Sequence, residues 1–124
     1  MTVKSLTAAD FEPTVLASPI VLVDFWAPWC GPCRAFTPVF ERSSQTHPDI
    51  VYAKVDTDAE RELAATVGIR SVPTIMAFRD GILVYSQPGA MSPAVLDDLI
   101  DQVKRLDMAQ VRATIAERKA AVKA

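Results

Sequence analysis

Cys30 and Cys33 stand three positions apart and are the only cysteines in the chain. A thiol pair at this spacing can form a static bridge, supply half of a zinc site, or open and close as a redox disulfide. A bridge across so short a loop adds little stability, because it restricts little of the unfolded chain. Zinc normally takes four ligands, and with one histidine in the chain, carboxylates would have to complete the set. Thiol–disulfide exchange is therefore the preferred interpretation, and no metal is expected.

The surroundings of the pair suit that chemistry. The cysteines follow an apolar run and begin a helical pattern, so free backbone N–H groups and the positive helix end favour a thiolate at Cys30. Gly31 allows close backbone approach, and Pro32 presets a helical φ where no N–H is needed. We expect Cys30 to be exposed and to attack a foreign disulfide. Cys33, one turn further in, would then resolve the mixed disulfide.

Asp24 is the single acidic residue in the apolar run from Ile20 to Ala27. This run predicts a strand buried on both faces, where an ionised carboxylate is costly. Taken alone, such an acid is as readily a hydrogen-bonded core residue as a functional one.

Periodicity and turn residues predict a mixed α/β domain whose central sheet is covered by helices on both faces. The expected elements are a helix over Ala8–Leu16, a strand over Ile20–Ala27, a helix kinked at Pro38 and reaching His47, a strand over Ile50–Val55, a helix over Ala59–Val67, strands over Thr74–Phe78 and Ile82–Ser86 joined by an Asp80–Gly81 turn, and a helix opened by Ser92–Pro93.

Charge is distributed unevenly along the chain. Residues 104–124 hold six basic and two acidic residues, which leaves seven basic and thirteen acidic residues in 1–103. We expect a domain over residues 1–105 and a basic amphipathic helical extension over 106–124. Met108, Val111, Ile115 and Val122 share one side of that helix, beside Arg105, Arg112, Lys119 and Lys123. The extension is either a solvated helix or a docking helix for a partner or an anionic surface.

Composition excludes several classes of function. The net charge is -2 and no basic run is interleaved with aromatic residues, so nucleic acid is not an expected ligand. No apolar stretch approaches the ~18 residues that span a bilayer. The first residues, from Met1 to Ser5, lack the apolar core of an export signal, so a cytoplasmic location is expected.

The segment from Asp24 to Cys33, DFWAPWCGPC, resembles the active-site segment of the thioredoxin family. The resemblance covers about residues 3–105 and is reinforced by further positions: Pro38, Lys54, the segment from Gly68 to Thr74 at the family's cis-proline position, Asp80–Gly81 and Gly89–Ala90. It implies a thioredoxin fold. Two departures stand out, because Arg34 replaces the lysine of many members and the chain continues past the usual end of the domain.

The resemblance also implies roles for individual residues. Cys30 would attack and Cys33 would resolve, the two forming the redox disulfide. Asp24, beneath them, would have a raised pKa and exchange a proton with Cys33. Lys54 would modulate that acid, although an ordinary lysine at a strand end would look the same. Pro73 would be cis and lie against the sulfurs, whereas taken alone it is a proline at the start of a strand.

A substrate-binding rim is implied around the pair. The backbone of Val72 would be free to pair with an extended client segment. Trp26 would support the active-site loop from behind. The residues expected to form the flat apolar rim are Trp29, Gly31, Pro32, Val72, Pro73, Gly89 and Ala90.

The family resemblance implies a protein-disulfide reductase that acts on disulfide-containing client proteins. It would bind no cofactor itself and would be recharged by thioredoxin reductase at the expense of NADPH. We expect a monomer. Two alternatives stay open: a disulfide oxidase or isomerase module on the same scaffold, and a binding protein that uses its basic tail.

Overall fold

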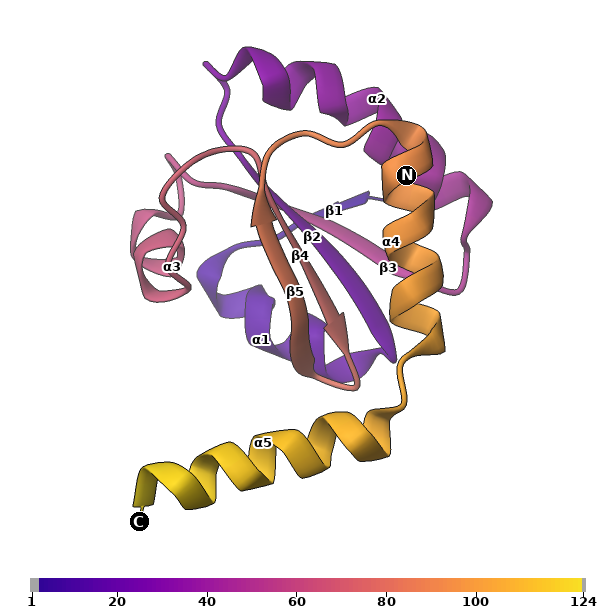
Figure 1. The fold of residues 1–124 in the computed structure, drawn as a ribbon. Coiled ribbons are helices and arrows are strands. Elements are labelled where there is room, and N and C mark those ends of the chain that lie inside the picture. Colours follow the sequence, from indigo (N-terminus) through magenta and orange to yellow (C-terminus); the bar gives the residue numbers. More distant parts are fainter. Residues whose placement is uncertain (1–2, 124) are drawn as a thin grey trace.

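The computed structural model describes residues 3–123, which form five strands and five helices. The chain runs through these elements in the following order: β1 (Val3–Ser5), α1 (Ala8–Ala17), β2 (Ile20–Trp26), α2 (Gly31–Thr46), β3 (Val51–Asp56), α3 (Arg61–Thr66), β4 (Thr74–Arg79), β5 (Ile82–Pro88), α4 (Pro93–Arg105) and α5 (Met108–Lys123) (Figure 1). The predicted helices and strands are confirmed to within one or two residues at most ends.

The five strands form one mixed sheet in the order β1-β3-β2-β4-β5. Strands β1, β3 and β2 are parallel, whereas β4 and β5 run antiparallel to their neighbours. Strand β1 is missing from the sequence-based prediction. Its three residues are too few to show a periodic pattern, and it is a strand because it pairs with β3, about 50 positions later in the chain. Strand β2 lies at the centre and carries the chain directly to the cysteines.

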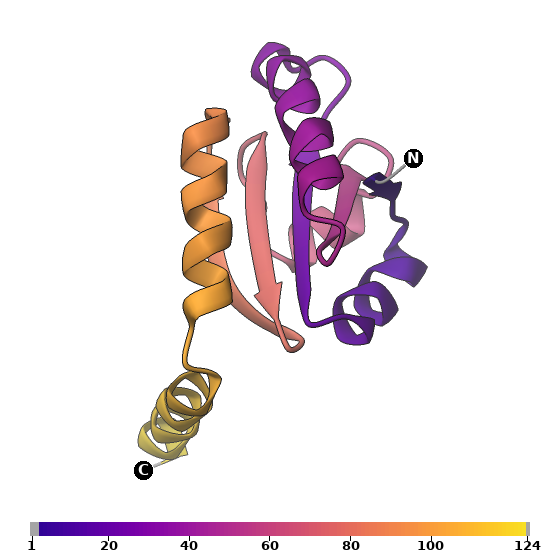
Figure 2. The same ribbon diagram turned by 90° about the vertical axis from the view of Figure 1, so that its right-hand side faces the viewer.

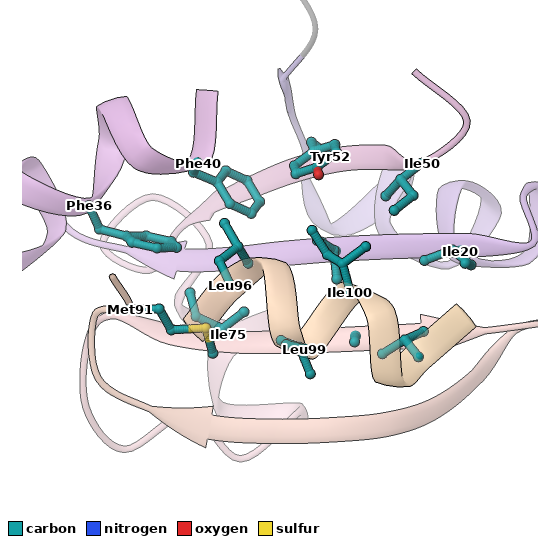
Figure 3. Close-up of a cluster of buried hydrophobic side chains, with 13 residues drawn as sticks. Ile20, Phe36, Phe40, Ile50, Tyr52, Ile75, Met91, Leu96, Leu99 and Ile100 are labelled. Carbon is teal, nitrogen blue, oxygen red and sulfur yellow. The ribbon is translucent and has the colours of Figure 1, made fainter. Parts of the chain in front are cut away.

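Alternating side chains of β2 divide the core into two layers. Ile20 and Leu22 belong to the cluster that α2 and α4 cover, drawn in Figure 3. Val21, Val23 and Phe25 belong to the opposite cluster, which includes side chains of α1 and α3. In Figure 1, α4 accordingly lies to the right of the sheet and α3 to its left. The prediction of a strand buried on both faces is confirmed, and Asp24 falls on the α2 and α4 face because it alternates with Val23 and Phe25.

Helix α3 is shorter than predicted. It begins at Arg61 rather than Ala59. The preceding residues form a turn in which Asp56 accepts hydrogen bonds from the backbone N–H groups of Asp58 and Ala59, at 2.9 and 3.3 Å. An aspartate that captures amides in this way competes with helix formation, so the helix starts after the turn.

The β4–β5 hairpin turns at Asp80 and Gly81, as predicted. Both residues have positive φ, 53° and 78°, which is the geometry of a two-residue hairpin turn that matches the twist of the strands. A side chain at Gly81 would also meet the Leu16 side chain at 2.9 Å. Position 81 therefore needs glycine for two reasons.

Helix α5 is separate from α4, because the backbone at Leu106 leaves the helical region (φ -56°, ψ 135°). Asp107 restarts the helix by accepting a hydrogen bond from the N–H of Gln110 at 3.2 Å. Of the predicted apolar side, Met108 is buried, whereas Val122 is 87 % exposed. The distal half of this side is exposed, since the helix extends past the end of the sheet (Figure 2).

Within residues 3–123, no helix combines the length and the apolar character that crossing a membrane requires.

Candidate active site

The two cysteines lie where β2 passes into α2. They form a disulfide with their Cα atoms 5.2 Å apart. Cys30 is the N-cap of α2, and its sulfur accepts a hydrogen bond from the backbone N–H of Cys33 at 3.2 Å. Pro32 occupies the first turn, where no N–H is required. The sulfur of Cys30 therefore sits on the free N–H groups of a helix start, an environment that stabilises a thiolate once the bond opens.

The cysteines are less accessible than expected. Cys30 is only 3 % exposed and Cys33 is buried as well. The expectation of an exposed Cys30 is wrong for this disulfide-bonded state. Its sulfur faces the first turn of α2 and lies 3.6 Å from the carbonyl oxygen of Val72, while Ala27 and Trp26 pack around the pair. A partner must therefore approach along the neighbouring loops.

Asp24 is 4 % exposed, and its Oδ1 has no hydrogen-bond partner within the described residues. Its register neighbours are Lys54 on β3 and Ile75 on β4. Burial raises the pKa of the carboxyl to about 7, because removal from water penalises the charged form more than the nearby Lys54 ammonium favours it. An acid in this state can take up and release a proton near neutral pH.

The ammonium group of Lys54 contacts the aromatic ring of Trp26. Its Nζ lies 5.3 Å from the centroid of the Trp26 ring, a cation–π contact. Trp26 is half-buried against the cysteine cluster, which confirms its expected packing. Sequence reasoning missed the contact, although Trp26 lies on β2 only two positions after Asp24, the register partner of Lys54 on β3.

The start of α2 and two loops meet beside the disulfide. The peptide bond between Val72 and Pro73 is cis, as expected. The carbonyl of Pro73 accepts a hydrogen bond from the N–H of Gly89 at 2.8 Å. Because the Val72 carbonyl also faces Cys30, the helix start, the cis-proline loop and the Gly89 loop meet at one edge.

The expected rim is mostly accessible. Trp29 is 67 % exposed, Val72 is half-buried, and the remaining exposed members are Gly31, Pro32, Gly89 and Ala90. Pro73 is the exception, since it is buried under the neighbouring loops. A Cβ added to Gly31 would meet no atom within 4 Å, so packing inside the chain does not require a glycine there.

A groove that sequence reasoning missed adjoins this rim. It has a volume of about 300 Å³ and runs between Trp29 and Val72 on one side and α3 on the other. Arg61 and Arg70 line it as well. They come from the helix and the loop that precede Pro73, and nothing in the local pattern marks them as neighbours of the tryptophan.

The comparisons with known proteins agree with this geometry. The family model described as Thioredoxin matches residues 2–120. The chain belongs to the thioredoxin family. It is 49 % identical over 115 residues to the protein named "Putative thioredoxin 2" of Streptomyces coelicolor, covering 93 % of this chain and 86 % of that one. It is 46 % identical over 100 residues to Thioredoxin 1 of Synechococcus elongatus, covering 79 % of this chain and 94 % of that one.

Solved thioredoxin structures share the fold. A variant thioredoxin from Halobacterium salinarum superimposes with a TM-score of 0.79 at 33 % identity, covering 84 % of this chain and 92 % of that chain. Membership of the family makes this protein a thiol–disulfide oxidoreductase, and thioredoxins need no bound cofactor. Within the described residues, no three His, Cys, Asp or Glu side chains are grouped closely enough to hold a metal ion.

Proposed function

We propose that this thioredoxin reduces client disulfides with Cys30 as the attacking thiol and Cys33 as the resolving thiol. The observation that carries the assignment is the position of the Cys30 sulfur, which accepts the Cys33 N–H at the start of α2. That N–H and the helix dipole stabilise the anion at Cys30. Cys33 follows within the first turn of α2, and among the described residues its sulfur accepts no backbone N–H.

In the first step the reduced enzyme attacks. The thiolate of Cys30 forms a bond to one sulfur of the client disulfide, the client S–S bond breaks, and the departing client sulfur takes up a proton from water. A mixed disulfide results. The client segment beside its cysteine would lie along Val72, whose carbonyl already faces the Cys30 sulfur.

In the second step Cys33 completes the exchange. Its thiol loses a proton to the carboxylate of Asp24, and the thiolate attacks the Cys30 sulfur. The bond from Cys30 to the client breaks, and the second client sulfur leaves as a thiolate that takes up a proton from water. Two electrons have then passed to the client, and the Cys30–Cys33 disulfide observed here is formed. Burial of Asp24 supports the assignment, because a pKa of about 7 allows both uptake and return of the proton.

The disulfide must be reduced again before another turnover. We assign this step to thioredoxin reductase, which would draw the electrons from NADPH and meet the same rim, including Trp29, Gly89 and Ala90. Lys54 would tune Asp24, and Gly31, Pro32 and Pro73 would hold the geometry of the loops. The proposed location is the cytoplasm, and the protein would act as a monomer, with residues 1–105 as the catalytic domain and 106–124 as an extension.

The test combines turnover with trapping. With thioredoxin reductase and NADPH, catalytic amounts of the protein should reduce insulin disulfides. Cys33→Ser should accumulate client proteins as mixed disulfides through Cys30, whereas the matched control Cys30→Ser should trap none. Absence of insulin reduction would favour the binding-protein alternative, and trapping by the Cys30 variant alone would reverse the two roles.

A further inference from the structure

We propose that the groove between Trp29 and α3 selects client segments that carry acidic side chains beside the reacting cysteine. The inference rests on the proposed function, since it concerns the client bound through Cys30. Arg61 and Arg70 are the residues that would confer the preference.

The groove is continuous with the reacting sulfur. Val72 lines it and also places its carbonyl oxygen 3.6 Å from the Cys30 sulfur. A client chain linked to Cys30 and lying along Val72 therefore reaches the groove within a few residues, because an extended chain advances by about 3.3 Å per residue. Ala64, Ile69 and Trp29 supply apolar surface there.

The charge of the groove is positive. Arg61 and Arg70 both line it and both are exposed, and among the residues that the structure describes neither forms an ion pair. No carboxylate among residues 3–123 lines the groove. Residues 1–103 carry thirteen acidic and seven basic residues, so this basic site contrasts with an otherwise acidic body.

Two of the acids close to Arg61 in the sequence, Glu60 and Asp56, are engaged elsewhere. Glu60 accepts a hydrogen bond from the backbone N–H of Ala8 at 2.8 Å, which directs it towards α1. Asp56 accepts from two backbone N–H groups of its own loop. Glu62 is exposed, but it is not among the residues that line the groove. The two guanidinium groups are thus free to bind an incoming carboxylate.

A carboxylate is the ligand that Arg61 and Arg70 are best suited to bind. A guanidinium presents paired N–H donors that match the two oxygens of a carboxylate. Charges at the edge of a site act mainly on the rate of encounter, and salt screens them. For exposed pairs we expect about a threefold to fivefold effect on kcat/KM from each arginine, in keeping with the modest strength of surface ion pairs.

The experiment compares three peptides, each with the same internal disulfide. They differ only in the two residues beside the target cysteine, which are glutamates in the first peptide, serines in the second and lysines in the third. kcat/KM is measured for the unchanged protein, for Arg61→Glu with Arg70→Glu, and for a matched control, Arg42→Glu with Arg118→Glu. The control makes the same change in charge at exposed arginines on α2 and α5 that do not line the groove. A neutral small-molecule disulfide reports the intrinsic reactivity of Cys30.

We expect the unchanged protein to favour the acidic over the basic peptide by about tenfold at low salt, and less at high salt. The Arg61→Glu, Arg70→Glu variant should lose or invert the preference for the acidic peptide, and the control variant should keep it. The neutral disulfide should react at the same rate with all three proteins. Arg61→Gln with Arg70→Gln should abolish the preference without inverting it. This result, together with unchanged reduction of the neutral disulfide, would attribute the preference to charge and not to misfolding.

Equal kcat/KM for the three peptides, or a preference that survives reversal of both arginines, would overturn the inference while reduction of the neutral disulfide left the proposed function intact. Failure to reduce even that neutral disulfide would instead count against the proposed function itself, and the inference would fall with it.

Discussion

At the scale of the single residue, Asp24 illustrates how burial creates reactivity. An ordinary aspartate ionises near pH 3.8, but this carboxyl has almost no exposed surface, and its Oδ1 has no hydrogen-bond partner among residues 3–123. The Lys54 ammonium opposes the effect without cancelling it, since it is drawn to the Trp26 ring rather than joined to Asp24 in an ion pair. The carboxyl therefore keeps its proton until the pH approaches 7.

The raised pKa predicts a pH-dependent stability. Between pH 3.8 and about 7 the folded protein holds a proton that the unfolded chain has released, so the contribution of Asp24 is full below pH 3.8 and is lost as the pH rises through 7. Asp24→Asn should therefore raise the free energy of unfolding of the oxidised protein by about 1–4 kcal/mol at pH 8, and by little at pH 4. Urea unfolding at both pH values measures this.

Asp58→Asn, at an exposed carboxylate, serves as the control and should change stability by less than about 0.5 kcal/mol at either pH. The Asp24 variant should also resolve mixed disulfides more slowly, because Cys33 loses its proton acceptor. A destabilised Asp24→Asn protein with unchanged exchange kinetics would make the residue a structural one.

At the scale of the element, α5 is an addition placed away from the chemistry. Both views show it at the opposite end of the molecule from the start of α2 (Figures 1 and 2). Its first half is attached by buried Met108 and by an ion pair of 3.1 Å between Arg112 and Asp80 at the hairpin turn. Up to Val122, which is 87 % exposed, the distal half shows no comparable attachment in the part of the chain that the structure describes.

Removal of residues 107–124 should leave insulin reduction within about twofold of the full chain. Stability should fall by about 1–3 kcal/mol, because Met108 no longer covers its apolar neighbours. Arg112→Ala alone should cost less than about 1 kcal/mol, since its ion pair with Asp80 is partly exposed. Turnover assays and urea unfolding of the three proteins measure these effects. A large loss of turnover on truncation would place α5 within the catalytic fold.

At the scale of the whole molecule, one apolar layer joins distant parts of the chain. Phe36 and Phe40 from α2, Leu96 and Ile100 from α4 and Tyr52 from β3 meet on one face of the sheet (Figure 3). This layer fixes α2, and therefore the cysteines at its start, relative to the central strand that carries Asp24. The geometry of the active site depends on packing that extends far from it.

Adjacent positions of α4 test this layer. Leu96 is fully buried whereas Val95 is 54 % exposed. Leu96→Ala should lower the free energy of unfolding by about 2–5 kcal/mol, because it leaves a cavity between α4 and the sheet. Val95→Ala should change it by less than about 0.5 kcal/mol. Chemical unfolding measures both, and equal effects would mean that the layer is not the main source of stability.

Much of the architecture follows from local signals. The buried run of β2, the Asp80–Gly81 turn and the cap at Ser92, which accepts the Val95 N–H at 3.2 Å, depend on residues close in sequence. Strand β1 was not predicted, because it exists through pairing with β3, and the start of α3 was predicted two residues too early, because Asp56 builds a turn there. Local periodicity carries neither kind of information.

The sequence by itself determined the chemistry. Two cysteines three positions apart, at the start of a helix and after a buried strand, specify thiol–disulfide exchange wherever the rest of the chain lies. Only the tertiary structure decided how deeply the pair is covered, that the Asp24 carboxyl titrates near 7, and that Arg61 and Arg70 share a groove with Trp29. The physical reason is that reactivity at sulfur is set by covalent type and immediate neighbours, whereas desolvation and surface charge are sums over elements that meet only on folding.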